Sequence, residues 1–102
     1  MAAHRFDTFP LPLASETPYG LNVDRTRNIV WVNGNQSDTL LAFDIASERW
    51  KVYPLSRYRS FTRDIEIAED GSVWTSNSNF PAWQIEDSHP TVIRVRASVA
   101  PP

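Results

Sequence analysis

The chain of 102 residues has no cysteine. This absence excludes a disulfide framework, a zinc site built on thiolates and a cysteine nucleophile together. Histidine is scarce as well, because only His4 and His89 are present. We therefore expect side-chain packing, and not covalent or metal cross-links, to hold the fold.

The chain also lacks an excess of charge of either sign and any long apolar run. Ten Lys and Arg side chains stand against twelve Asp and Glu side chains, for a formal net charge of −2. No strongly basic surface exists to bind nucleic acid or an anionic membrane, so neither is expected as a partner. No stretch approaches the roughly 18 apolar residues of a membrane span, and no signal peptide is seen. The sequence as given predicts a cytoplasmic protein, unless sequence upstream of it carries a signal.

Signals for helices are nearly absent. Eight prolines interrupt the chain, with runs at 10–18 and 81–90, and no apolar stripe at helical spacing exceeds one turn. Short segments that alternate apolar and polar residues, such as LNV at 21–23, are typical of strands. Asp70 and Gly71 form a hairpin signal, because glycine accepts a positive φ without steric cost. These features predict an all-β fold, and a chain of this length fills one domain.

The sequence repeats itself at an offset of 44 residues, which a deletion of one residue and then an insertion of nine residues change for the later segments. Four pairs of segments recur in the same order: FDTFPL at 6–11 and WKVYPL at 50–55, LNV at 21–23 and IEI at 65–67, IVW at 29–31 and SVW at 72–74, and TLLAF at 39–43 and TVIRV at 91–95. We infer two repeats, at about 6–48 and about 50–96, within one β-propeller segment that spans residues 1–102.

Each repeat has room for four short strands, which is the content of one propeller blade. The strands, named d, a, b and c in chain order, are expected at about 5–11, 20–24, 29–33 and 39–44, and again at 49–55, 64–68, 73–76 and 91–96. A β-sandwich is also built of short strands, but it has no reason to repeat the same residues at a fixed period. We therefore predict two four-stranded antiparallel blades in the order d-a-b-c-d-a-b-c.

Two predictions about the core follow from this arrangement. The a strands, at 21–24 and 65–68, are expected to be the most buried. Trp31 and Trp74 occupy equivalent places in the two b strands, so both are expected in the core.

The segments TPYGLNVD at 17–24, NIVWV at 28–32, LAFD at 41–44 and WKVYPL at 50–55 carry a likeness to a known family. They resemble a blade of the streptogramin (virginiamycin B) lyases, which reads roughly Pro-x-Gly-Ile-x-x-Asp, Asn-x-Trp-Phe, Ile-x-x-Phe-Asp-Pro and an acidic-aromatic-Pro-Leu-Pro ending. The resemblance covers residues 6–96. Its motifs are shared with NHL-repeat and gluconolactonase-like propellers, so it implies the fold more than the activity.

The resemblance implies a Mg²⁺-assisted elimination that opens a cyclic depsipeptide antibiotic at its ester bond, with a histidine and a glutamate from central strands. In this sequence Tyr19 and Arg63 occupy the two positions that match the histidine. The positions that match the glutamate fall within 33–35 and 76–78, which contain no carboxylate. No catalytic residue is therefore carried over, and catalysis by this chain alone is not expected. No cofactor is expected either, except Mg²⁺ on the resemblance alone.

In a propeller the d–a and b–c connections lie on the face where ligands enter the central channel. The long segments 56–63 and 77–90 are connections of these two kinds, and long loops on one face often carry function. We therefore predict a ligand-binding face formed by Tyr19, Asn33, Asn35, Arg63, Asp64, Asn77, Asn79, Trp83 and His89.

Both long segments also have a purely structural interpretation. The arginines of 57–63 suit a carboxylate or phosphate ligand, but aromatics and arginines in alternation equally suit packing between blades with solvated charges. The oxygen side chains of 77–89 suit Ca²⁺ or Mg²⁺, but their spacing matches no metal motif and such residues also cap turns. No metal site is predicted.

Two classes of function remain open. The first, which we favour, is a binding or interaction scaffold made of propeller blades. The second is part of a Mg²⁺-dependent virginiamycin B lyase-like enzyme that acts on a cyclic ester or lactone, with its catalytic residues in blades outside this sequence. Both require further blades, because two blades cannot close a ring and natural rings have about 4–8. The partner blades would lie in a longer parent chain or come from head-to-tail association of copies.

Overall fold

The computed structural model describes residues 5–34, 37–55, 62, 64–76 and 91–96. These residues form seven strands and no helix, so no helix among them is long and apolar enough to cross a membrane. The strands are β1 (Pro18–Asp24), β2 (Ile29–Gly34), β3 (Thr39–Asp44), β4 (Arg49–Pro54), β5 (Glu66–Ile67), β6 (Val73–Ser76) and β7 (Val92–Val95). The predicted all-β class is confirmed.

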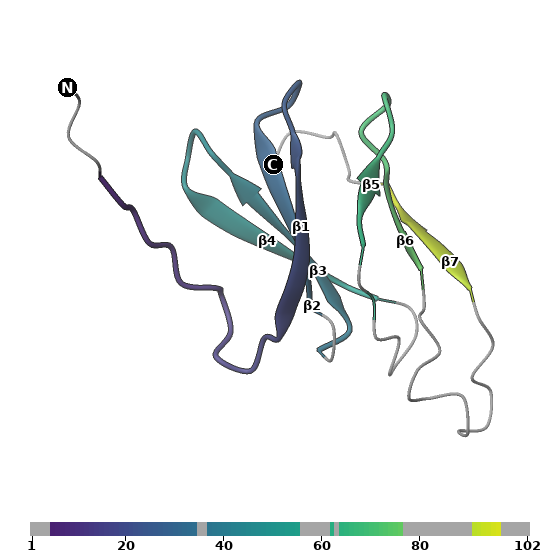
Figure 1. The fold of residues 1–102 in the computed structure, drawn as a ribbon, viewed down its shortest axis with the longest axis horizontal. Helices are drawn as coiled ribbons and strands as arrows, with labels where there is room; N and C mark the ends of the chain where they lie inside the picture. The colour runs from purple at the N-terminus through teal and green to yellow at the C-terminus, as the bar shows by residue number, and fades with distance from the viewer. Residues whose placement is uncertain (1–4, 35–36, 56–61, 63, 77–90, 97–102) are drawn as a thin grey trace.

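The strands form two antiparallel sheets that stand side by side (Figure 1). The first sheet has the order β1-β2-β3-β4, and the second has the order β5-β6-β7. β4 opens the second sequence repeat, yet it pairs with β3 and completes the first sheet. This is the arrangement of a propeller blade whose outer strand begins the next repeat.

Aspartates at the ends of strands cap the tight turns of the first sheet. Asp24 Oδ1 accepts hydrogen bonds from the backbone N–H groups two and three residues later, both at 3.1 Å. Asp44 Oδ1 does the same after β3, at 2.9 and 3.3 Å. The two turns then end on Asn28 and Glu48, each with a φ of 57°. Because these contacts involve only neighbouring residues, the sequence is sufficient to locate the hairpins.

The hydrophobic core lies between the two sheets. We call the side of the first sheet that faces the second sheet its front face, and the opposite side its back face. Side chains alternate between the faces of a strand, and the front face carries Trp31, Leu40 and Ala42. The second sheet turns its own back face, with Ile65 and Val73, toward them. All five side chains are buried in one cluster, so the front face of one sheet is packed on the back face of the next.

The strand expected at about 5–11 is not formed. The structure describes residues 5–11, and they pair with no other strand. A strand needs a neighbour for its backbone hydrogen bonds, and no described strand lies beside this segment to provide them. The segment instead crosses the back face of the first sheet, where the ring centroids of Phe9 and Phe43 lie 4.8 Å apart. Phe9 and Phe43 match Tyr53 and Val95 in the sequence repeat, and both of those also pack against the core.

The a strands are not the most buried, contrary to the prediction. Leu21 in β1 is 67% exposed, whereas residues 39–43 of β3 are all buried. β3 lies between β2 and β4 and has cover on both faces, whereas β1 is an edge strand of its sheet. Position within the sheet therefore decides burial more strongly than the apolar pattern of the strand.

The prediction that both equivalent tryptophans are core residues is half wrong. Trp31 is 1% exposed, but Trp74 is 38% exposed. Trp31 points from the front face of the first sheet into the second sheet. Trp74 points from the front face of the second sheet, and no further sheet among the described residues covers that face. The repeat thus predicted the equivalent orientation of the two side chains correctly, but not their burial.

We expect Trp31→Ala to lower the free energy of unfolding by about 3–5 kcal/mol, because it leaves a large cavity between the sheets. Trp74→Ala should cost about 1 kcal/mol, the usual effect at a partly exposed site. Unfolding by denaturant, followed by circular dichroism, measures both. Equal losses in the two variants would contradict the open face around Trp74.

Candidate functional site

Of the nine residues predicted to form a ligand-binding face, the structure describes three: Tyr19, Asn33 and Asp64. The other six lie outside the described residues and are Asn35, Arg63, Asn77, Asn79, Trp83 and His89. The first residues of β1 and β5 and the last residues of β2 and β6 all lie at the same end of the two sheets (Figure 1). The described members of the set therefore lie at one end of the two sheets.

The three described residues differ in what they offer a ligand. Tyr19 is 63% exposed, and Asp64 is exposed just before β5. Asn33 is fully buried, and its Oδ1 accepts a hydrogen bond from the Gly20 backbone N–H at 2.9 Å. This bond lies where the register of β1 against β2 shifts, between Pro18 and Leu21. Asn33 therefore positions the start of β1, and a ligand-binding role for Tyr19 and Asp64 stays a prediction.

A carboxylate that the sequence analysis did not single out, Glu16, lies at this end as well. Its Oε1 accepts hydrogen bonds from the hydroxyls of Ser37 and Thr39, each at 2.7 Å. These groups close tightly over Gly34, where an added Cβ would collide with both hydroxyls. Glu16 Oε2 is buried and has no hydrogen-bond partner.

Glu16 and its hydroxyl partners tie the segment before β1 to the turn between β2 and β3. One carboxylate with two hydroxyls does not provide a catalytic pair or a metal cage. Nor do the described residues contain any group of three or more His, Asp or Glu side chains that could hold a metal ion. The cluster is a structural cross-link.

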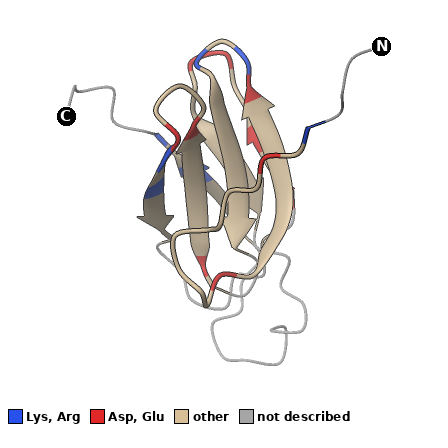
Figure 2. Cartoon of the chain, turned by 90° about the vertical axis from the view of Figure 1, so that its left-hand side faces the viewer, with Lys and Arg blue, Asp and Glu red and all other residues tan. Residues whose placement is uncertain are grey.

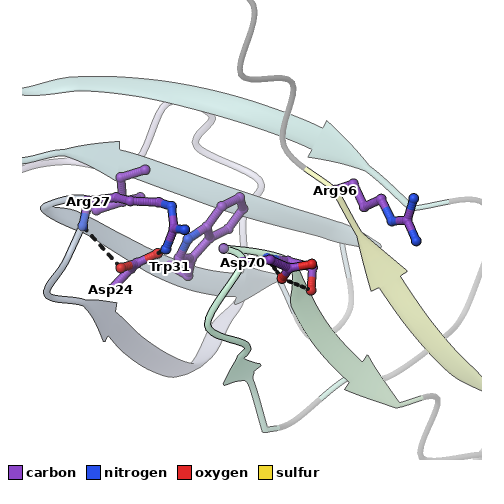
Figure 3. A pocket seen from close by; sticks show the side chains of 8 residues that line it. Asp24, Arg27, Trp31, Asp70 and Arg96 are labelled. Carbon is purple, nitrogen blue, oxygen red and sulfur yellow. Dashed lines mark hydrogen bonds and ion pairs between the residues drawn. The ribbon is translucent and has the colours of Figure 1, made fainter.

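A cavity of about 330 Å³ lies at the opposite end, where the two sheets meet (Figure 3). It is lined by Asp24, Arg27, Ile29, Trp31, Asp70, Gly71, Ser72 and Arg96. Figure 3 shows that Asp24, Arg27 and Trp31 come from the first sheet, whereas Asp70 and Arg96 come from the second.

Arg27 bridges the sheets at this cavity. Its guanidinium donates one hydrogen bond to Asp24 Oδ2 at 3.1 Å and another to the backbone carbonyl oxygen of Glu69 at 2.9 Å. Asp24 is 5% exposed, so it is a buried charge that needs such a partner. Gly71 has a φ of 90°, and an added Cβ there would lie 2.7 Å from Arg27 Nε. Glycine is therefore required at this position for two reasons: the turn has a positive φ, and a larger side chain would displace the Arg27 guanidinium.

Asp70 supplies the second carboxylate of the cavity. Hydrogen bonds from the Ser72 hydroxyl and backbone N–H, at 2.7 and 2.9 Å, hold the pKa of Asp70 below its ordinary value of 3.8. A desolvation effect opposes them, and the positive charges of Arg96 and Arg27 lower the pKa further. Trp31 Nε1 is buried without a hydrogen-bond partner. The groups that line the cavity are engaged in holding the two sheets together, since Arg27 binds both Asp24 in the first sheet and the Glu69 carbonyl oxygen in the second.

The third notable surface is the front face of the second sheet, which we define by Glu66, Trp74, Ser76, Val92 and Arg94. The strand register places Glu66, Trp74 and Arg94 in one row across β5, β6 and β7. The Arg94 guanidinium carbon lies 5.2 Å from the centroid of the Trp74 ring. Val92 is 70% exposed. This face combines an exposed aromatic ring with one charge of each sign.

The back face of the first sheet is different. Figure 2 shows that the strands seen from this side carry their charged residues near the strand ends. The N-terminal segment crosses it and leaves a hollow of about 490 Å³. Phe9, Leu11, Val30, Phe43 and Trp50 are among the residues that line this hollow. Two carboxylates, Asp7 and Glu48, also line it, whereas no arginine or lysine among the described residues does.

Structures of two lyases are among the solved structures that resemble the chain. One is a streptogramin B lyase structure, with 19% sequence identity and a TM-score of 0.60 over 66% of this chain and 22% of the lyase chain. The other is the crystal structure of selenomethionine-substituted virginiamycin B lyase from Staphylococcus aureus, with 22% identity and a TM-score of 0.56 over 61% of this chain and 20% of that chain. No family model and no curated protein matches the chain.

At this level of identity the likeness shows the fold, which is propeller-like, and confirms the predicted resemblance to streptogramin lyase structures. The chain spans about a fifth of the length of these lyase structures.

We expect Asp70 to make the stability of the protein depend on pH in the acid range. Because the folded protein lowers the pKa of Asp70, its ionised form stabilises the fold above pH 3.8, and this contribution is lost as the pH falls through the lowered pKa. Asp70→Asn should therefore be less stable than the native protein at neutral pH, and the difference should shrink below pH 3.8. Urea unfolding across this pH range measures the difference.

Ser72→Ala provides the second arm of this test. It removes the hydrogen bond that is the largest cause of the lowered pKa and keeps the backbone hydrogen bond, so it should reduce the pH-dependent part. A difference between Asp70→Asn and the native protein that does not change with pH would contradict the assignment.

Proposed function

We propose that the chain is an interaction scaffold, a propeller-like segment that docks another β-sheet on the front face of its second sheet. The observation that carries this proposal is the contrast between two equivalent tryptophans. Trp31 is buried by the sheet that follows it, whereas Trp74 points in the corresponding direction and is 38% exposed. A partner's sheet on this front face would bury Trp74, just as the second sheet of this chain buries Trp31.

Two further properties of this surface support docking. Exposed apolar side chains that share one sheet face, here Trp74 and Val92, are typical of interaction sites, and tryptophan is enriched among the residues that contribute most to binding. β7 is also an edge strand, since it pairs with β6 on one side and with no described strand on the other. An edge strand offers backbone donors and acceptors to a strand of a partner. The partner could therefore cover the face and extend the sheet in one binding event.

A photocross-linker on the open face tests the proposal. The full chain is produced in cells of the organism that encodes it, with p-benzoylphenylalanine in place of Trp74. After irradiation, we expect a product in which this side chain is cross-linked to the partner. Mass spectrometry should identify the partner peptide as a strand of a β-sheet with apolar side chains.

The matched control is Ser47→p-benzoylphenylalanine, on the exposed turn between β3 and β4. It should give none of this product. If position 74 gave no product beyond that of position 47, docking on the front face would be wrong.

An enzymatic role is the second candidate, and the likeness to two lyase structures is the observation that favours it. In that case the chain would belong to a Mg²⁺-dependent enzyme acting on a cyclic ester or lactone, with the catalytic residues in other blades. Tyr19 and Arg63 stand at the positions that match the histidine of the resemblance, and neither side chain is an effective general base at neutral pH.

We therefore expect the purified chain not to open a streptogramin B antibiotic in the presence of Mg²⁺. Chromatographic separation of the cyclic and linear forms measures this directly, against a sample without protein. Turnover above that sample would show that this chain carries its own catalytic residues.

A further inference from the structure

The packing between the two sheets of this chain shows what a docked sheet must offer. At this internal interface Asn22 Nδ2 donates a hydrogen bond to the Ile65 backbone carbonyl oxygen at 2.9 Å. Arg27 donates to the Glu69 carbonyl oxygen at 2.9 Å. In the same row as Asn22, two strands away in β3, the small side chain of Ala42 is buried in the core cluster. The front face of the first sheet therefore supplies two donors and one small apolar residue.

The front face of the second sheet has different chemistry at each of these three positions. In the sequence repeat Glu66 takes the place of Asn22, and Arg94 takes the place of Ala42. The turn that matches the one bearing Arg27 runs from 68 to 71 and has no arginine. The donor at the first position has become an acceptor, the small residue has become a large cation, and the bridging cation is missing.

A second copy of the chain would not fit this face in the same geometry. By the repeat, Leu21 is the counterpart of Ile65, so the Glu66 carboxylate would meet the Leu21 carbonyl oxygen. Two acceptors would then face each other with no proton between them, and a buried charge without a partner is strongly unfavourable. Arg94 would enter a space that in the internal interface holds only the methyl group of Ala42.

We infer that the front face of the second sheet takes a sheet of different sequence, and not a second copy of this chain. The fitting partner has a hydrogen-bond donor opposite Glu66, a carboxylate or carbonyl oxygen opposite Arg94, and apolar side chains opposite Trp74 and Val92. The inference rests on the proposed docking function and specifies its partner. Electrostatic complementarity of this kind excludes wrong partners more than it adds affinity.

The test restores the chemistry of the first sheet on the second. The native chain should sediment as a monomer across a wide range of concentration. The test uses a Phe9→Ala background, which loosens the N-terminal segment from the back face that a copy must present. In this background Glu66→Asn with Arg94→Ala should raise the constant for head-to-tail self-association about tenfold or more, since it replaces two unfavourable contacts with those of the internal interface. Arg94→Ala alone should have a smaller effect.

The matched control is Arg49→Ala with Glu48→Asn, which changes the same charges at exposed positions where β3 turns into β4, in the other sheet. It should sediment like the native chain. Urea unfolding of every variant shows beforehand that each is folded.

Three outcomes would overturn the inference. The first is a discrete trimer or tetramer of the native chain, which would mean that a copy does fit. The second is a double variant that stays monomeric, and the third is aggregation that does not respond to Glu66 and Arg94. All three leave the docking function itself standing, because only the cross-linking result at position 74 decides that.

Discussion

The burial of one side chain, Trp31, between the two sheets is the interaction on which the rest of the structure depends. Neither sheet has a core of its own, because the second consists of three short strands and the first has cover on its front face only from the second. Burying an indole ring removes a large apolar area from water and contributes several kcal/mol. The ring also lies beside Tyr53, with centroids 5.4 Å apart. Because Trp31 is in β2 and Tyr53 is in β4, both strands take part in the contact with the second sheet.

Hydrophobic burial alone does not fix how one sheet is aligned on the other, since apolar surfaces are not directional. The alignment is set by polar groups at the rim of the contact. Asn22 donates a hydrogen bond to the backbone carbonyl oxygen of Ile65, just before β5. Arg27 donates one to the backbone carbonyl oxygen of Glu69, in the turn after β5. Each donor is held in place by its own sheet, Arg27 through Asp24 and Asn22 through the strand register. Apolar residues thus supply most of the stability of the contact between the two sheets. Charged and amide groups fix how the sheets are aligned.

The sequence predicted well what depends on neighbouring residues. Seven of the strands follow from alternation and from the sequence repeat, and the turns after β1 and β3 close through hydrogen bonds of Asp24 and Asp44 that stay within the turn. The strand expected at 5–11 and the burial of Trp74 were wrong for a common reason. A repeat shows that two segments have the same local pattern, but it does not show whether another sheet lies beside them. Glu16 and Arg27 were missed because their partners, Ser37 and the Glu69 carbonyl, are distant in the sequence.

Sequence repeats are nevertheless informative where equivalent positions differ. A position that serves the same contact in every repeat should keep its chemistry, as Trp31 and Trp74 do. Asn22 and Glu66 do not, although one of them makes a hydrogen bond across the sheets. The substitution of an acceptor for a donor carries no information about strand formation, since both residues lie in a strand. It carries information about the surface opposite, because each side chain is suited to a different partner atom. Differences between repeats therefore describe how the neighbours of two sheet faces differ, and similarities such as Trp31 and Trp74 describe what those neighbours share.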